Sequence, residues 1–379
     1  MKRVRNHRIA SLSSVVVLAM LVLSACGSNN GNSGASSSPA SPSASPSASS
    51  ASSSPAASGE KSFEGQKLVV GVWGGSYAET IEKYVVEPLE AQGATVELVL
   101  GGTGDRLAKM YAEKGNPTMD VAFLNLYESK QAIDDGVADP VDPSIPNFSQ
   151  LYPAAQENGY GMTFMGLGIV YNKDLVTEPI AEWADLWRED LKGKVAFPTY
   201  PGFEGDALVA IAGKAFGKTE QDDQANFDKL KELGPVPMSY SNLDELFLEM
   251  KNGSVLAAPI FNSYANEYIK KGFPVEFVSP NSPGPVMAKD TIVIAKGTKV
   301  PELAKEFVNL AIGVETQEHF ATDLFFGPTN KEVTVPDDLA AQIVYGEEAV
   351  SKLEVLDWDY IISKRSDWTQ KWNTEILAN

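Results

Sequence analysis

Few side chains in this sequence could perform catalysis. The chain of 379 residues contains one cysteine and two histidines. His319 lies in a segment, residues 315–322, that we predict to be helical, and a lone helical histidine is more often structural or exposed than catalytic. The sequence has no Gly-x-Ser-x-Gly elbow, His-Glu-x-x-His helix or phosphate-binding Gly-Lys loop. We therefore expect a binding protein without catalytic residues, metal or cofactor. A membrane-anchored hydrolase that uses carboxylates is the alternative.

Cys26 is the residue whose surroundings indicate covalent chemistry. It follows a basic segment at residues 2–8, an apolar run at residues 15–23 that is too short to cross a bilayer, and the residues Leu23-Ser24-Ala25. This order resembles the lipobox of bacterial lipoproteins, in which the cysteine is lipidated and becomes the first residue after cleavage. The sequence therefore predicts a signal peptide over residues 1–25 and lipidation at Cys26. An ordinary secretory signal with an incidental cysteine is the alternative.

The segment after this cysteine is predicted to be a tether. Residues 27–58 are nearly all Ser, Ala, Pro, Gly and Asn, without an apolar period, and such a composition cannot compensate the entropy lost on ordering. We expect residues 26–60 to be a disordered spacer that carries the lipidated end. The remaining chain, from residue 61 onwards, exceeds the usual length of one domain and predicts two lobes.

Net charge limits the choice of partners. The formal net charge is −19, and removal of residues 1–25, which carry four basic and no acidic residues, takes it to −23. Such a surface repels nucleic acid and anionic membranes and attracts cations. We expect no nucleic-acid partner. Solubility alone is an equal explanation of the charge, which does not by itself identify a ligand.

Three apolar segments alternate with three amphipathic ones. We predict strands at residues 67–72, 96–100 and 119–124, and helices at residues 76–91, 105–113 and 127–135. The residues from Ser76 to Glu79 match a capping box that would begin the first helix. This order is typical of an α/β fold with a mostly parallel sheet, whose ligands bind beyond the carboxyl ends of the strands. Residues 73–76, 101–103 and 125–127 occupy those ends.

Five stretches, in order along the chain, resemble the spermidine/putrescine-binding family among the extracellular solute-binding proteins of ABC importers. They are residues 72–77 (VWGGSY), 119–122 (MDVA), 166–172 (GLGIVYN), 183–198 (WADLW followed by KGKVAFP) and 326–330 (FGPTN).

The resemblance implies a two-lobed periplasmic-binding-protein fold of type II, with a ligand cleft between lobes that close by a hinge motion. Residues 61–165 and 290–330 would form lobe one, and residues 166–289 and 331–379 would form lobe two. Residues 169–171 and 291–294 would be the crossing strands. The family implies a monomer that captures a small molecule and delivers it to an ABC permease. It would act at the extracellular face of the membrane, or in the periplasm if the cell has an outer membrane.

Lobe one of such a protein offers its strand ends to the ligand. The positions that match the family here are Trp73, Asn125 and Tyr127, and a ligand carboxylate could lie over Gly75 and Ser76 at a helix start. Aromatic faces would attract an ammonium group and pack its methylene groups. Trp73 is equally compatible with a core position, and Tyr127 with an ordinary first helical turn.

Lobe two should supply Tyr200 and Glu204, from the loop after residues 195–197, together with Phe261 and Asn262. Asp206, in the same loop, is more consistent with helix capping or first-turn charge than with ligand contact. The acidic pair of the family's polyamine binders lies earlier in this loop than Glu204 and Asp206 do here.

Two further positions complete the predicted site. The resemblance places an amine-binding carboxylate at Asp290 and an aromatic residue at Phe326. A hinge hydrogen-bonding role is the alternative for Asp290. Together these residues favour a small organic amine, either a polyamine or a related amino compound. Ferric iron, a sugar or an anion are the alternative ligands.

Overall fold

The computed structural model describes residues 62–378, so the signal peptide predicted at residues 1–25, the lipidation site Cys26 and the tether predicted at residues 26–60 lie outside the described residues. Within the described part, no helix is long and apolar enough to span a membrane.

The first quarter of the described chain forms three parallel strands with helices between them. The strands are β1 (Lys67–Val72), β2 (Thr95–Leu100) and β3 (Val121–Asn125), and β1 pairs with both neighbours. The intervening helices are α1 (Ser76–Ile81), continued by a π-helical turn (Glu82–Val86) and α2 (Glu87–Ala91), then α3 (Thr103–Ala112) and α4 (Leu126–Asp134). These elements confirm the predicted strands and helices in this region to within a few residues at each end.

The start of α1 differs from the predicted capping box. Gly75, not Ser76, occupies the N-cap position, and no side chain caps the helix. Gly75 has φ of +66°, a left-handed conformation that glycine adopts without the Cβ penalty of other residues. Its carbonyl accepts the N–H of Glu79, so the prediction that Ser76 and Glu79 cap each other is wrong.

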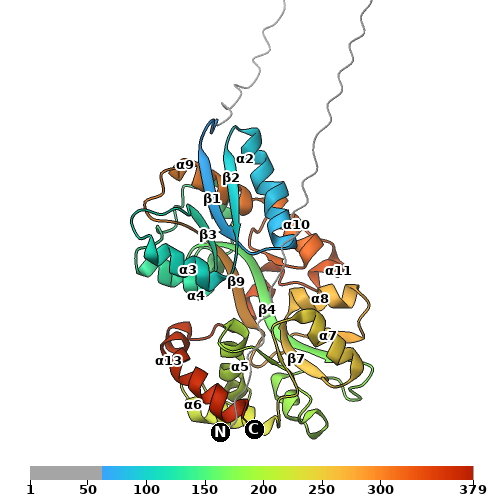
Figure 1. The fold of residues 1–379 in the computed structure, drawn as a ribbon. Coiled ribbons are helices and arrows are strands. Elements are labelled where there is room, and N and C mark those ends of the chain that lie inside the picture. Colours follow the sequence, from blue (N-terminus) through green and yellow to red (C-terminus); the bar gives the residue numbers. More distant parts are fainter. Residues whose placement is uncertain (1–61, 379) are drawn as a thin grey trace, which may run out of the picture. The chain divides into compact units, whose positions relative to one another are not determined.

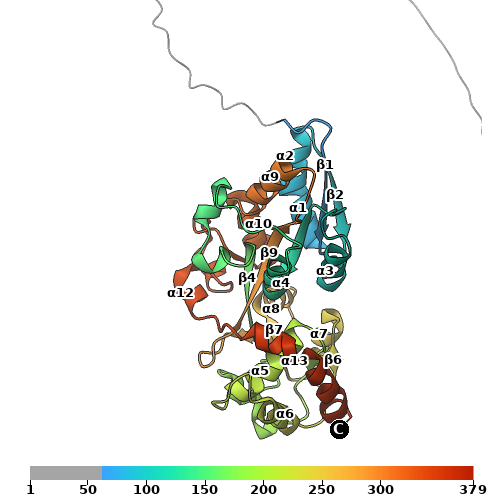
Figure 2. The same ribbon diagram turned by 90° about the vertical axis from the view of Figure 1, so that its left-hand side faces the viewer.

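Two long strands join the two lobes. β4 (Tyr160–Asn172) and β9 (Val286–Ile294) pair antiparallel and are buried along their whole lengths. Figures 1 and 2 show them side by side between the group that holds β1, β2 and α3 and the group that holds α5, α6 and α13. The residues predicted for the crossing strands, 169–171 and 291–294, lie within these two elements. The lobe boundaries stay a prediction, because β4 and β9 run without interruption through residues 165–166 and 289–290.

The sheet is mixed, not mostly parallel as predicted. Its strand order is β10-β4-β9-β3-β1-β2, with β7 (Ala257–Phe261) and β8 (Val275–Val278) also paired to β4. All pairings of β4 are antiparallel, including that with β10 (Gly327–Pro328), and β9 pairs antiparallel with β3. The prediction considered only the first three strands, which are parallel, and missed the return direction of β9.

The remaining elements lie in the predicted second lobe and at the end of the predicted first lobe. In the predicted second lobe, β5 (Phe197–Pro198) pairs with β6 (Ser239–Tyr240), and the helices include α5 (Phe203–Lys214), α6 (Asp223–Glu232), α7 (Leu243–Asn252) and α8 (Asn262–Lys270). The later helices are α9 (Pro301–Ala311), α10 (Val314–Leu324), α11 (Asp337–Ala340), α12 (Gly346–Ser351) and α13 (Trp358–Lys371). The helix α13 packs beside α5 and α6, because Arg365 bonds to Asp206 of α5, and Trp368 and Lys371 bond to residues of α6 (Figure 1).

Candidate functional site

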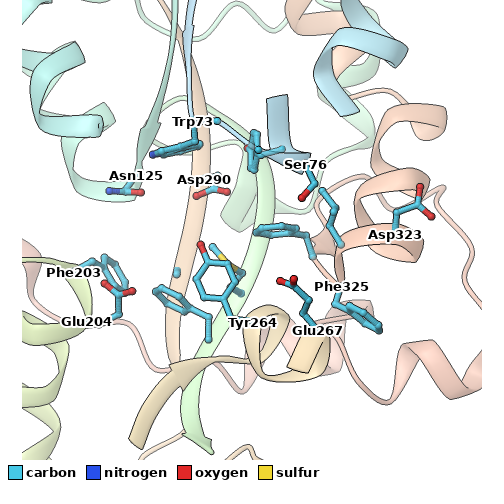
Figure 3. Close-up of a pocket in the computed structure, with 18 of the residues that line it drawn as sticks. Trp73, Ser76, Asn125, Phe203, Glu204, Tyr264, Glu267, Asp290, Asp323 and Phe325 are labelled. Carbon is cyan, nitrogen blue, oxygen red and sulfur yellow. The ribbon is translucent and has the colours of Figure 1, made fainter. Parts of the chain in front are cut away.

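A cavity of about 800 Å³ lies where the ends of β1 and β3 meet β9 and the starts of α5 and α8. That volume is typical of a small-molecule site. Eight of the predicted ligand-binding residues line it: Trp73, Gly75, Ser76, Asn125, Glu204, Phe261, Asp290 and Phe326. Figure 3 shows Trp73, Asn125 and Asp290 on one side of the cavity and Phe203, Glu204 and Tyr264 on the other.

Asp290 is the most buried carboxylate of the cavity, with 6% of its surface exposed. Strand pairing sets its position, because β9 places it opposite Asn125 of β3 on one side and Thr163 of β4 on the other. The Thr163 hydroxyl donates a hydrogen bond of 2.8 Å to Oδ2 of Asp290. Burial raises the pKa of Asp290 to about 7, and the bond from Thr163 opposes this shift. A carboxylate so poorly solvated would gain strongly from a cationic partner.

Aromatic rings form the wall next to this carboxylate. Trp73 follows the last residue of β1, and its Nε1 donates to the Thr103 hydroxyl at 3.2 Å. The Trp73 and Tyr77 rings meet edge to face, with centroids 5.1 Å apart, and Tyr77 packs in the same way against Phe326 at 5.8 Å. Burial raises the pKa of Tyr77 well above its ordinary value, so its hydroxyl stays neutral beside Asp290.

The opposite wall comes from the starts of α5 and α8. The rings of Phe203 and Phe261 lie 5.6 Å apart, and Phe261 meets Tyr264 edge to face at 5.9 Å. Glu204 is half-buried beside them, and burial raises its pKa. A ligand in the cavity would therefore touch carboxylates and aromatic rings from both lobes.

The lysines that line the cavity already have partners. The Nζ of Lys289 donates to the main-chain oxygens of Ala154 at 2.8 Å and Glu157 at 2.6 Å. Lys271 forms an ion pair of 2.7 Å with Glu267. Lys270 Nζ lies 5.2 Å from the centroid of the Phe325 ring, and Figure 3 shows Phe325 on the opposite side of the cavity from Asn125. The cavity surface near Asp290 is thus acidic and aromatic.

Three predicted ligand-binding residues lie outside this cavity. Tyr127 accepts a hydrogen bond of 2.7 Å from Arg365, and its ring stacks on Trp358 at 5.3 Å. Tyr200 stacks on Trp372 at 4.9 Å.

Asn262, the third, has a bonding role in the fold. It accepts the N–H of Gly166 at 2.9 Å and donates to the Gln342 carbonyl at 3.2 Å. It is the first residue of α8 and not its N-cap, which is Phe261.

Asp206 lies in the first turn of α5, as predicted, and does not line the cavity. Its side chain is fully buried and forms an ion pair with Arg365 of α13, with Nε of Arg365 3.0 Å from Oδ2. Its charge is thus matched by a residue far along the sequence.

Phe203 and Tyr264 are cavity residues that the sequence interpretation missed. Phe203 precedes the predicted Glu204, and Tyr264 follows the predicted Phe261 by three residues, one helical turn later on the same face of α8. The helical period from Phe261 could have identified Tyr264 in advance.

The described residues contain no metal site that could serve as a second candidate functional site. Among residues 62–378, no group of three His, Cys, Asp or Glu side chains is placed to hold a metal ion. His319 of α10 stacks on Tyr84, with ring centroids 3.9 Å apart, and its Nδ1 lies 3.1 Å from Asp323.

Solved structures with the same fold come from transport proteins. A structure of an ABC transporter protein from Clostridium perfringens is 31% identical, covers 82% of this chain and 99% of its own, and superposes with a TM-score of 0.71. A spermidine/putrescine ABC transporter substrate-binding protein from Streptococcus pneumoniae is 22% identical over the same shares, with a TM-score of 0.67.

Sequence relatives extend the same result. The gamma-aminobutyric acid-binding protein of Pseudomonas aeruginosa is 23% identical over 279 residues, which are 71% of this chain and 78% of that protein. The predicted two-lobed type II fold and the resemblance to spermidine/putrescine-binding proteins are confirmed. The family model of the bacterial extracellular solute-binding proteins matches residues 81–343. The chain therefore belongs to this family of ABC-transporter solute-binding proteins, which serve transport and not catalysis.

Proposed function

We propose that this solute-binding protein captures a small organic amine and delivers it to an ABC permease from a lipid-anchored position outside the membrane. The observation that supports the amine is the buried carboxylate of Asp290 in a cavity walled by Trp73, Tyr77 and Phe261. An ammonium group at Asp290 would replace lost hydration with a charge-assisted hydrogen bond, and the rings would pack its methylene groups.

Relatives suggest two kinds of amine. The spermidine/putrescine-binding relatives take their name from ligands with several ammonium groups, and the gamma-aminobutyric acid-binding relative takes its name from an amino acid with a carboxylate. An acidic ligand group would need a cationic or N–H partner. Lys289 and Lys271 are already bonded, whereas Lys270 and the start of α1 at Gly75 and Ser76 also line the cavity. The buried carboxylate of Asp290 thus fits an amine, with or without an acidic group, better than iron, a sugar or an anion.

Anchoring is the second part of the proposal. The lipobox-like residues before Cys26 and the Ser/Ala/Pro-rich segment after it support a lipidated protein whose binding lobes can reach a membrane partner. We further propose that the protein works as a monomer.

Calorimetric titration of the mature protein with an amine found by thermal-shift screening tests the ligand class. Asp290→Asn keeps the shape of the side chain and removes its charge. We expect affinity to fall by roughly 30- to 5,000-fold, because truncation of a buried charge pair usually costs about 2–5 kcal/mol. Glu204→Gln should have a smaller effect, since Glu204 is less buried than Asp290.

The exposed Asp338 of α11 offers a control, because Asp338→Asn removes the same charge away from the cavity. Its affinity should equal that of the wild type. Unchanged affinity in Asp290→Asn would contradict the amine site and favour a sugar or an anion.

A further inference from the structure

The Trp73 indole lies between the cavity and a buried cation. The guanidinium carbon of Arg106, on α3, lies over the ring at 4.7 Å from its centroid, and Arg106 is only 3% exposed. Trp73 lines the cavity, whereas Arg106 does not. Figure 3 shows the indole edge-on above Asn125 and Asp290, with one ring face directed toward the cavity. Because Arg106 lies over the indole without lining the cavity, we infer that it covers the face turned away from the ligand.

Hydrogen bonds fix this pair. Arg106 donates from Nε to the Phe123 carbonyl at 2.8 Å and from Nη1 to the Gly101 carbonyl. Its Nη2 reaches the Thr103 hydroxyl at 3.4 Å, and the same hydroxyl accepts Nε1 of Trp73 at 3.2 Å. Burial lowers the pKa of Arg106 to about 10, so the group stays charged at neutral pH. The ring cannot move away from its cation without breaking these bonds.

A second cation on the cavity face of the indole would be repelled through the ring. At a similar height above that face, the second cation would lie about 9 Å from the guanidinium. In an effective dielectric of about 20, the repulsion between two unit charges at this separation lowers the affinity for that cation about 20-fold. A cation–π contact typically adds about 2- to 30-fold. The repulsion is therefore large enough to cancel the attraction.

We propose that Arg106 determines specificity, because it prevents Trp73 from binding a cation and restricts the cleft to primary ammonium groups that can hydrogen-bond to Asp290. Quaternary ammonium groups, which have no N–H to donate and depend on aromatic faces, are rejected. Trp73 then serves as an apolar wall for methylene groups. This inference rests on the proposed amine-binding function.

Two probes of equal chain length test it by calorimetric titration of the mature protein: 1,4-diaminobutane and its analogue with both nitrogens trimethylated. The wild type should prefer the primary amine by at least 10-fold. Asp290 alone could produce that preference, so the decisive variant is Arg106→Gln, which removes the charge. In this variant, the ratio of the affinity for the quaternary probe to the affinity for the primary amine should rise by at least 5-fold. The conservative control Arg106→Lys should retain the wild-type ratio. An unchanged ratio in Arg106→Gln would overturn the inference.

A second measurement leaves Arg106 in place, and so covers the case in which Arg106→Gln fails to fold. Replacing all six tryptophans by 5-fluorotryptophan weakens the attraction of each indole for cations, and Trp73 is the tryptophan that lines the cavity. The affinity for each probe should change by less than 2-fold. A fall of more than 3-fold would show that Trp73 does bind the cation and would overturn the inference. If the wild type binds neither probe, the amine found by thermal-shift screening and its N-trimethylated analogue take their place. If it binds no amine, the proposed function is contradicted, and the inference falls with it.

Discussion

Asp290 illustrates how a binding residue can reduce the stability of the protein that holds it. The carboxylate is buried and receives one hydrogen bond from Thr163, so its charged form is poorly compensated while the cavity is empty. Its pKa is about 7 in the folded state, and an unfolded Asp has a pKa near 3.9. The folded state thus binds the proton more tightly than the unfolded state, and the stability contributed by this proton is lost as pH rises from about 4 to 7.

Asp290→Asn should therefore stabilise the ligand-free protein at alkaline pH. Each pKa unit corresponds to about 1.36 kcal/mol, so the free energy of unfolding at pH 8 should rise by about 2–4 kcal/mol. The gain should be much smaller at pH 4.5, where Asp290 is protonated in the folded state. Urea unfolding at the two pH values measures this difference. A gain that is the same at both pH values would show that burial of the charge is not its cause.

Among the elements, the first three strands were the easiest to predict. Each is a short apolar run, and β1 and β2 end before paired glycines, so local pattern and tertiary structure agree. β4 was predicted only in its last residues, because a strand buried on both faces shows no alternation of polar and apolar side chains.

The sequence predicted those site residues whose positions depend on the end or the pairing of a single strand. Trp73, Asn125 and Asp290 reach the cavity because they lie at the ends or pairing positions of β1, β3 and β9. Tyr127 and Tyr200 do not, because they contact Arg365 and Trp372 near the C-terminus. Those partners lie more than a hundred residues away, and no local spacing indicates them.

The helix α13 provides a prediction at the scale of elements. Arg365 on this helix pairs with Asp206 of α5 and donates to Tyr127 of α4, and thus connects three helices. The Asp206 side chain is fully buried, and its Oδ1 has no hydrogen-bond partner, so Arg365 is its main compensation. Arg365→Ala should lower the free energy of unfolding by about 3–5 kcal/mol, because it leaves a buried charge unpaired. Urea unfolding measures the loss.

Two further variants separate the ion pair from the hydrogen bond to the tyrosine. Tyr127→Phe removes one hydrogen bond and should cost only about 0.5–1.5 kcal/mol. Asp206→Asn combined with Arg365→Ala should recover part of the loss, since the unpaired charge is gone. A loss below 1 kcal/mol in Arg365→Ala alone would contradict the assigned role of the pair.

At the scale of the whole molecule, the cleft and the anchor serve different steps of transport. β4 and β9 join the lobes beside the cavity, so a ligand held between Asp290 and Phe261 contacts residues of both. Binding at 100 times the dissociation constant would stabilise the folded state by about 2.7 kcal/mol. Retention near a permease is a separate requirement of the proposed delivery.

Cys26 should provide that retention. Loss of the lipidated cysteine removes the acyl chains, and no other part of the proposed function holds the protein at the membrane, so Cys26→Ser should move it from the membrane to the exported soluble fraction. Its affinity for the ligand should stay unchanged, because the cavity is formed entirely by residues 73–326. Ser50→Ala, within the same predicted tether, is the matched control and should remain with membranes. Fractionation after a high-salt wash distinguishes lipidation from charge attraction, which salt screens. Cys26→Ser protein that still sediments with membranes after this wash would show that another part of the chain is the anchor.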